Sequence, residues 1–116
     1  MSNRTVRLNE LVQREISEIL RQRYQTEAVA ITVTEVRVAP DLRDARVFVS
    51  VVGDDETAAA KLRWLRRQSR AIRGEMSRRV VLKYLPKFEY LLDRSSVRAT
   101  HVMQLLDELD GPKKAD

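Results

Sequence analysis

Residues 36–50 read VRVAPDLRDARVFVS, and they contain the clearest indication of the fold. Apolar and polar side chains alternate before and after the dipeptide Pro40-Asp41, as they do in half-buried β-strands that are joined by a turn. The alternation extends upstream to about Val29 and downstream to Val51. The sequence therefore predicts that residues 29–39 and residues 45–51 pair as an antiparallel hairpin.

The first of these strands changes phase in its middle. Ile31 and Val33 share one face of the strand, whereas Val36 and Val38 fall on the opposite face if the alternation is strict. A bulge or bend near Glu35 would return all of these side chains to the same face. We therefore expect an irregularity at that position.

A helix is expected on each side of the hairpin. Upstream, residues 5–24 carry apolar side chains at the helical period, with arginines outside that face. Downstream, an acidic residue or Thr57 can cap a long helical region that runs to about Leu82. The apolar period weakens beyond Met76, so we expect a kink or break in this helix between residues 68 and 77.

The remainder of the chain completes an α+β domain. Leu85-Pro86 excludes further helix, and the alternation in residues 88–92 predicts a third strand. Residues 95–109 then show the period of a C-terminal helix, and residues 110–116 form a short charged tail. Helix, strand, strand, kinked helix and strand is the order of the KH-like RNA-binding fold in its type II form, with helices on one face of a three-stranded sheet. We interpret residues 5–109 as a single KH-like RNA-binding domain.

Length and composition suit one cytoplasmic domain. The chain has 116 residues, enough to bury roughly two thirds of the surface that its unfolded form exposes. Cysteine is absent, which excludes disulfides and thiolate metal sites, and we expect no cofactor and no metal. No run of apolar residues approaches a membrane span, and the first residues do not have the pattern of a secretory leader. We therefore expect no membrane partner.

Positive charge is concentrated between Lys61 and Lys83. That segment holds nine basic residues and one acidic residue, Glu75, whereas the whole chain has 22 basic and 17 acidic residues. On a helical wheel the apolar side chains form one stripe and arginines form the neighbouring one. Because guanidinium groups match phosphate geometry, we predict nucleic-acid contacts for Arg63, Arg66, Arg67, Arg70, Arg73, Arg78, Arg79 and Lys83. A solvated basic face without a ligand is the alternative that charge alone leaves open.

Other conspicuous side chains do not indicate catalysis. His101 is the only histidine, and no spacing typical of a nucleophile with its base, or of metal ligands, is found. We therefore predict no catalytic residues. Trp64 falls outside the apolar stripe of its helix, so it either stacks on a base or covers the edge of the sheet.

The hairpin resembles the pattern V-x-V-x-x-D-L-x-x-A-x-V-x-V-S of the ribosome-binding factor A family. The resemblance extends over residues 5–109, and further matches follow in order at Ile72-Arg73, Leu85-Pro86, Phe88-Glu89-Tyr90 and Asp93-Arg94-Ser95. One position departs from the family, which has an Ala-x-Gly step at its helix kink where this chain has Gln68-Ser69-Arg70. The departure replaces a glycine with a cation.

The resemblance implies a ribosome assembly factor that is not an enzyme. Such a factor binds the free small (30S) ribosomal subunit and its 16S rRNA during late maturation and 5′-end processing, and it is important in the cold. The resemblance also implies a cytoplasmic monomer that meets other assembly factors or GTPases.

Two alternatives stay open. A DNA-binding regulator would present a helix to the major groove and would usually be a dimer. An RNA-cleaving enzyme would need Glu75, His101 or an aspartate as its general base.

Overall fold

Six elements follow one another in the computed structural model, which describes residues 3–93. They are α1 (Asn3–Arg23), α2 (Gln25–Ala28), β1 (Ile31–Val38), β2 (Asp44–Val51), α3 (Asp55–Arg79) and β3 (Lys87–Leu92). The order is the predicted one, with the addition of the short helix α2, which the sequence did not indicate. The predicted C-terminal helix (residues 95–109) and the charged tail (residues 110–116) lie outside the described residues.

The strands form one mixed sheet in the order β1-β2-β3. β1 and β2 pair antiparallel, which confirms the predicted hairpin, and β2 and β3 pair parallel across the long connection through α3. The register of β1 shifts between Val33 and Glu35, where the irregularity was expected. Because of this shift, Ile31, Val33, Val36 and Val38 are all buried.

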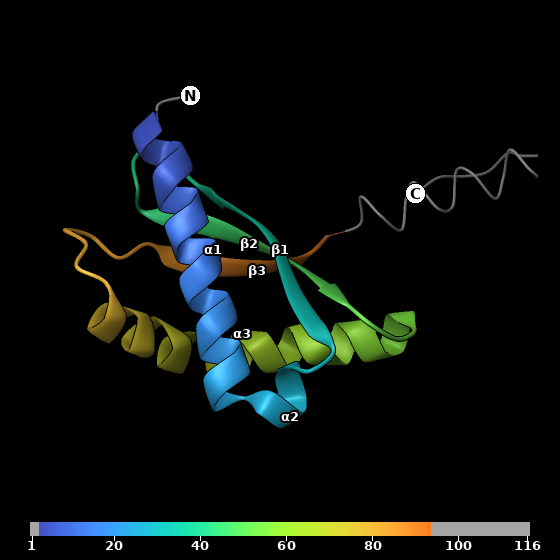
Figure 1. The fold of residues 1–116 in the computed structure, drawn as a ribbon. Helices are drawn as coiled ribbons and strands as arrows, with labels where there is room; N and C mark the ends of the chain where they lie inside the picture. Colours follow the sequence, from blue (N-terminus) through green and yellow to red (C-terminus); the bar gives the residue numbers. More distant parts are fainter. Residues whose placement is uncertain (1–2, 94–116) are drawn as a thin grey trace, which may run out of the picture.

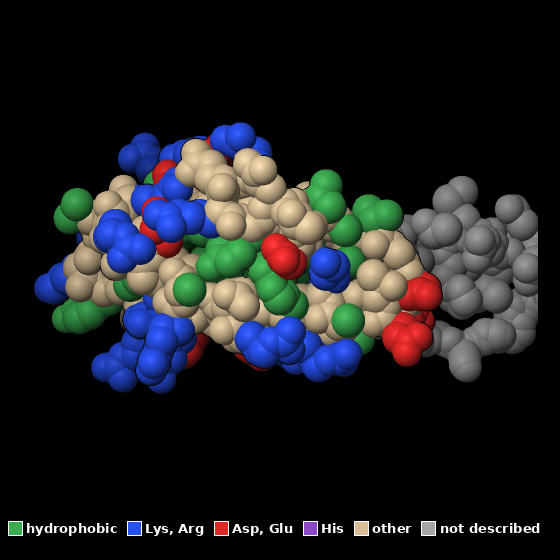
Figure 2. Space-filling view, turned by 90° about the horizontal axis from the view of Figure 1, so that it is seen from below, with side chains coloured by type: hydrophobic (Ala, Val, Ile, Leu, Met, Phe, Trp, Pro, Cys, Tyr) green, Lys and Arg blue, Asp and Glu red, His purple; other side chains and the backbone are tan. Residues whose placement is uncertain are grey.

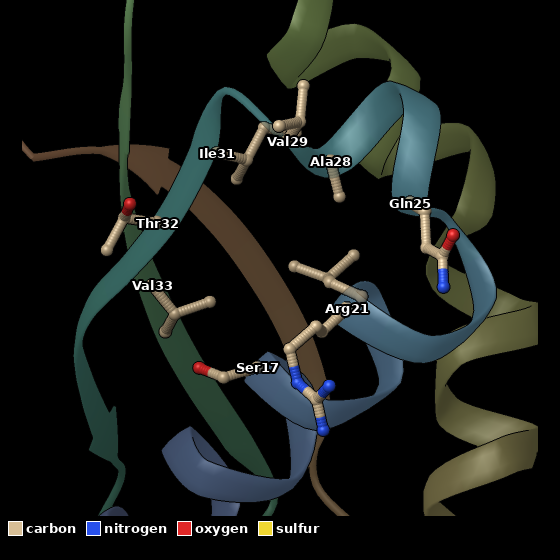
Figure 3. A pocket seen from close by; sticks show the side chains of 9 residues that line it. Ser17, Arg21, Gln25, Ala28, Val29, Ile31, Thr32 and Val33 are labelled. Atoms are coloured by element: carbon tan, nitrogen blue, oxygen red, sulfur yellow. The ribbon is translucent and has the colours of Figure 1, made fainter.

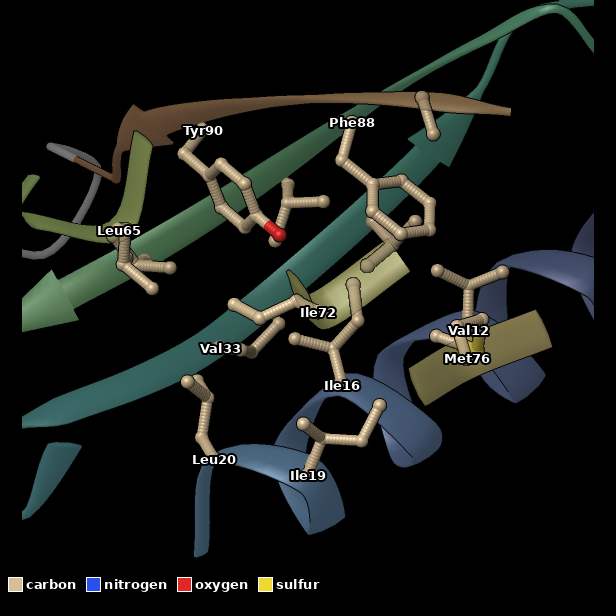
Figure 4. Packing of buried hydrophobic residues seen from close by; sticks show 14 of the residues in the cluster. Val12, Ile16, Ile19, Leu20, Val33, Leu65, Ile72, Met76, Phe88 and Tyr90 are labelled. Atoms are coloured by element: carbon tan, nitrogen blue, oxygen red, sulfur yellow. The ribbon is translucent and has the colours of Figure 1, made fainter. Parts of the chain in front are cut away.

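The two long helices α1 and α3 cover the same face of the sheet (Figure 1). Between the layers lies the hydrophobic core, whose packing is seen in Figure 4. Ile16 of α1, Val47 of β2 and Ile72 of α3 are fully buried in it. Each such side chain contributes about 1.5–3 kcal/mol when it leaves water. On the strands, exposed residues such as Arg46 and Glu89 alternate with the buried ones, so the opposite face of the sheet is polar.

The break that the weakening apolar period allowed is wrong, because α3 is one uninterrupted helix of 25 residues, and a kink within this continuous helix stays a prediction. Leu65, Ile72 and Met76 are fully buried, and their spacings of seven and four residues keep them on one face of a continuous helix. Gly74 does not relieve a crowded contact, since a Cβ atom at this position would meet nothing within 4 Å. The core contacts therefore keep α3 helical past the residues that differ from the family pattern.

The ends of α3 are set by local chemistry. Asp54 caps the first turn, and its Oδ1 accepts a hydrogen bond from the backbone N–H of Thr57 at 2.8 Å, which lowers the pKa of Asp54. The helix ends at Arg79 and not at the predicted Leu82, because Val80 already has the extended conformation with φ −128° and ψ 150°. β-branched residues favour this conformation.

Candidate nucleic-acid interface

The eight predicted cations lie on α3 and on the segment that follows it, but their surroundings differ. Three of them point away from the core without an acidic partner, two bind backbone carbonyl groups, two share a glutamate, and Lys83 lies beyond the helix. The structure thus separates a set of residues that the sequence presented as one stripe.

Arg63, Arg67 and Arg70 are exposed and form the part of the stripe that we call the central arginines. Their spacings of four and three residues place them on one face of α3. Within residues 3–93, none of the three has an ion pair or a side-chain hydrogen bond. Their positive charge is therefore uncompensated, and all of their N–H donors are available to an anion such as phosphate.

Arg66 and Arg73 join α3 to the chain around β3. Arg66 Nη2 donates a hydrogen bond to the carbonyl oxygen of Tyr90 at 3.1 Å. Arg73 donates from Nε to the carbonyl oxygen of Pro86 at 3.0 Å and from Nη2 to that of Leu85 at 2.6 Å. These side chains keep their positive charge, but part of their hydrogen-bonding capacity is used inside the protein.

Arg78 and Arg79 surround the carboxylate of Glu75. Arg78 Nη2 and Arg79 Nε lie 2.7 Å and 3.2 Å from the Glu75 oxygens, and Arg23 of α1 approaches the same group to 3.0 Å. The hydrogen bonds from Arg78 and Arg79, helped by the charge of Arg23, lower the pKa of Glu75. Arg79 also lies 3.8 Å from Glu15 of α1. The geometry therefore favours the central arginines over this pair as phosphate ligands.

A signal for these ion pairs was present in the sequence. Glu75 precedes Arg78 by three residues and Arg79 by four, which is the spacing of interacting pairs on a helix. The contacts from Arg23 and Glu15 had no such signal, because they depend on how α1 crosses α3.

Trp64 has a packing role. Its indole meets the ring of Tyr24 edge to face, with ring centroids 5.2 Å apart and an angle of 82° between the planes. Both side chains pack against the hydrophobic core. This contact joins α3 to the residue that follows α1, and base stacking or cover of a sheet edge by Trp64 stays a prediction.

Charge is distributed unevenly along α3. Figure 2 views the molecule from the side of α2 and α3 and shows acidic side chains at one end, with separate groups of Lys and Arg along an edge and toward the other end. The first turn of α3 contains Asp55 and Glu56, and its last turn contains Arg78 and Arg79. This polarity complements the helix dipole. It also places the central arginines between the acidic first turn and the ion pairs of the last.

The hollow between α1, α2 and β1 lacks the charge for a nucleic-acid site. Ala28, Ile31 and Val33 contribute apolar lining, and Arg21 is the cation that lines this hollow (Figure 3). Arg21 is already paired with Glu18 at 2.6 Å.

Within residues 3–93, no cluster of three or more His, Asp or Glu side chains could hold a metal ion, and no helix has the length and apolarity of a membrane span.

Comparison with known sequences identifies one family. The sequence model of the family described as "Ribosome-binding factor A" matches residues 4–106. A protein of that name from Opitutus terrae is 66% identical over 110 residues, which are 95% of this chain and 90% of the relative. Another from Acetivibrio thermocellus is 37% identical over 113 residues, which are 96% of this chain and 92% of the relative.

Comparison with solved structures agrees. The fold is similar to the crystal structure of ribosome-binding factor A from Thermus thermophilus, with a TM-score of 0.69 and 26% identity over 78% of this chain and 98% of that one. It is also similar to a homology model of the Thermus thermophilus factor fitted into a cryo-EM map of a complex with the 30S subunit. That match has a TM-score of 0.62 and 29% identity over 75% of this chain and 92% of that one. These likenesses confirm the predicted KH-like α+β class.

Proposed function

The chain belongs to the ribosome-binding factor A family, and from this premise we propose that it binds the free small (30S) ribosomal subunit through the exposed face of α3. The observation that carries the proposal is the set of three central arginines, Arg63, Arg67 and Arg70, which have no acidic partner in the described part of the chain. The similar Thermus thermophilus factor, fitted into the map of a 30S complex, supports the choice of partner.

The proposed contact is mainly electrostatic. Spacings of four and three residues spread the central arginines over about 10 Å along α3. Leu65 and Ile72 pack the opposite face of α3 into the core, so the helix holds these charges at fixed positions relative to the rest of the domain. Arg66 and Arg73 add positive charge beside them. Specificity then comes from the shape of the folded rRNA, since side chains read duplex RNA mostly through its backbone and shape.

The biological role that we propose is non-catalytic assistance in late maturation of the subunit, including 5′-end processing of 16S rRNA. RNA helices are more stable in the cold, so misfolded rRNA persists longer there and a chaperone-like factor matters more. The protein would act as a monomer in the cytoplasm, where ribosomal subunits are assembled. Other assembly factors or GTPases would meet it on the subunit.

Cosedimentation with purified small subunits tests the proposal. The triple variant Arg63→Glu, Arg67→Glu, Arg70→Glu should fold normally, because substitutions at exposed sites change stability by about 0.5 kcal/mol or less each. It should bind the subunit much more weakly, because the charges that meet phosphate are reversed. If three phosphate contacts are lost, the slope of log affinity against log salt should become shallower by roughly 2–3.

A control with the same change in net charge is Arg14→Glu, Arg43→Glu, Lys87→Glu, at exposed positions away from the central arginines. It should retain most of the binding. Equal binding by the two triple variants would show that the site lies elsewhere, and stronger binding to duplex DNA than to subunits would favour the DNA-binding alternative.

A further inference from the structure

A second basic surface lies in a groove on another part of the molecule. Its walls are the first turns of α1, the turn between β1 and β2, and the segment between α3 and β3. The groove has a volume of about 560 Å³, within the range of small-molecule sites. None of the central arginines lines it.

The walls of the groove are apolar and well supported. Leu8 and Leu42 pack against the hydrophobic core, and Pro40 and Leu82 lie beside them. Leu42 has a φ of 64°, the left-handed region that leucine rarely adopts. The turn holds it there through a hydrogen bond from its N–H to the carbonyl oxygen of Ala39 at 2.8 Å. Strained residues of this kind concentrate at functional sites.

The rim of the groove is cationic. Arg4, Arg7 and Lys83 all line it, all are exposed, and no aspartate or glutamate is among the lining residues. In the described part of the chain none of these three cations has an ion pair. The groove therefore complements a ligand that is apolar in its body and anionic at its edge.

Tyr84 adds an exposed aromatic ring to the groove. The residue is 64% exposed, and the ammonium group of Lys83 lies 5.6 Å from the centre of its ring. An exposed aromatic ring beside cations is an arrangement with which proteins hold single-stranded nucleic acid, since the base stacks and the phosphate is neutralised.

We propose that this groove binds an unpaired RNA nucleotide, whose base stacks on Tyr84 against the apolar wall and whose phosphate meets Arg4 and Arg7. The bases of a duplex are stacked on each other, so the site selects a single-stranded loop or end. The inference goes beyond binding of the small subunit by α3, and it concerns different residues and a different feature of RNA.

Fluorescence anisotropy with a short fluorescein-labelled oligouridylate tests the site in the full chain. Tyr84→Ala should weaken binding by roughly fivefold to a hundredfold, the range found when one stacking aromatic is removed. Tyr84→Phe keeps the ring and should bind as the wild type does. The same oligonucleotide without its bases should bind wild type and Tyr84→Ala equally, whereas Arg4→Glu with Arg7→Glu should weaken both ligands. Thermal melts verify that each variant is folded.

The measurement is repeated in the background of the Arg63→Glu, Arg67→Glu, Arg70→Glu variant, where the effect of Tyr84→Ala should persist. Failure of the wild type to bind, an unchanged affinity of Tyr84→Ala, or equal losses for Tyr84→Ala and Tyr84→Phe would each overturn the stacking site. Because none of these outcomes involves ribosomal subunits, they are distinguishable from a failure of the α3 proposal.

Discussion

The central arginines and the arginines at the end of α3 are the same residue type on one helix, yet their surroundings differ. Arg63, Arg67 and Arg70 have no ion pair in the described part of the chain. Arg73 binds the carbonyl oxygens of Leu85 and Pro86, and Arg78 and Arg79 share Glu75. The arginines of one basic helix therefore do not form a single binding surface.

The availability of a cation for a ligand therefore matters as much as its presence. A guanidinium that already donates to a carboxylate must lose that interaction, or share its donors, before it binds phosphate. One without a partner loses only hydration, which is weak for arginine. The two regions should therefore respond differently to substitution: the central arginines through binding, and the end of the helix through stability.

The largest change in stability is expected for Arg73→Ala. The substitution removes charge-assisted hydrogen bonds to Leu85 and Pro86, so the free energy of unfolding should fall by about 2 kcal/mol. The matched control is Arg70→Ala, at an exposed position without a partner, which should change stability by about 0.5 kcal/mol or less. Urea denaturation measures both. Equal effects of the two substitutions would remove the distinction between the regions.

A smaller loss, of about 1 kcal/mol, is expected for Arg66→Ala. Arg66 lies between Arg63 and Arg67 in the sequence but donates one hydrogen bond to the Tyr90 carbonyl, at 3.1 Å. The Arg66→Ala substitution therefore tests whether Arg66 acts mainly in stability, as Arg73 does, or mainly in binding, as the central arginines do. A measurable loss in urea denaturation would group Arg66 with Arg73, whereas unchanged stability with weakened subunit binding would group it with the central arginines.

The smallest effect is expected for Glu75→Gln, and it should depend on pH. Arg78 and Arg79 hold the pKa of Glu75 below its ordinary value of 4.5, so the ionised carboxylate stabilises the folded state above that pH. This stabilisation is lost as the pH falls through the lowered pKa. The variant should be less stable than wild type at neutral pH, and the difference should shrink below pH 4.5.

Thermal melts across that pH range measure the difference. Glu10→Gln is the charge-matched control, because Glu10 is exposed and has no ion pair among residues 3–93. It should melt close to wild type at neutral pH. If the gap between wild type and Glu75→Gln stayed constant as the pH fell, the ion pairs at the end of α3 would not be stabilising through the Glu75 charge.

Local patterns in the sequence determined much of the fold. The alternation on both sides of Pro40-Asp41 predicted the hairpin, and the phase change between Val33 and Val36 predicted the bulge. The concentration of basic residues between Lys61 and Lys83 located the candidate interface. Such features are readable because strands and helices have fixed side-chain periods, and a residue and its near neighbours are enough to establish them.

Other features depend on contacts between segments that are distant in the sequence, among them the continuity of α3 and the partners of its cations. The weakening period after Met76 indicated a break in α3, but the buried row of Leu65, Ile72 and Met76 keeps the helix continuous. Arg73 meets the carbonyl groups of Leu85 and Pro86 because β3 returns beside α3. The groove that contains Tyr84 is lined by residues from segments 4–11, 40–42 and 82–84. No local pattern could predict it, because only the packed fold brings those segments together.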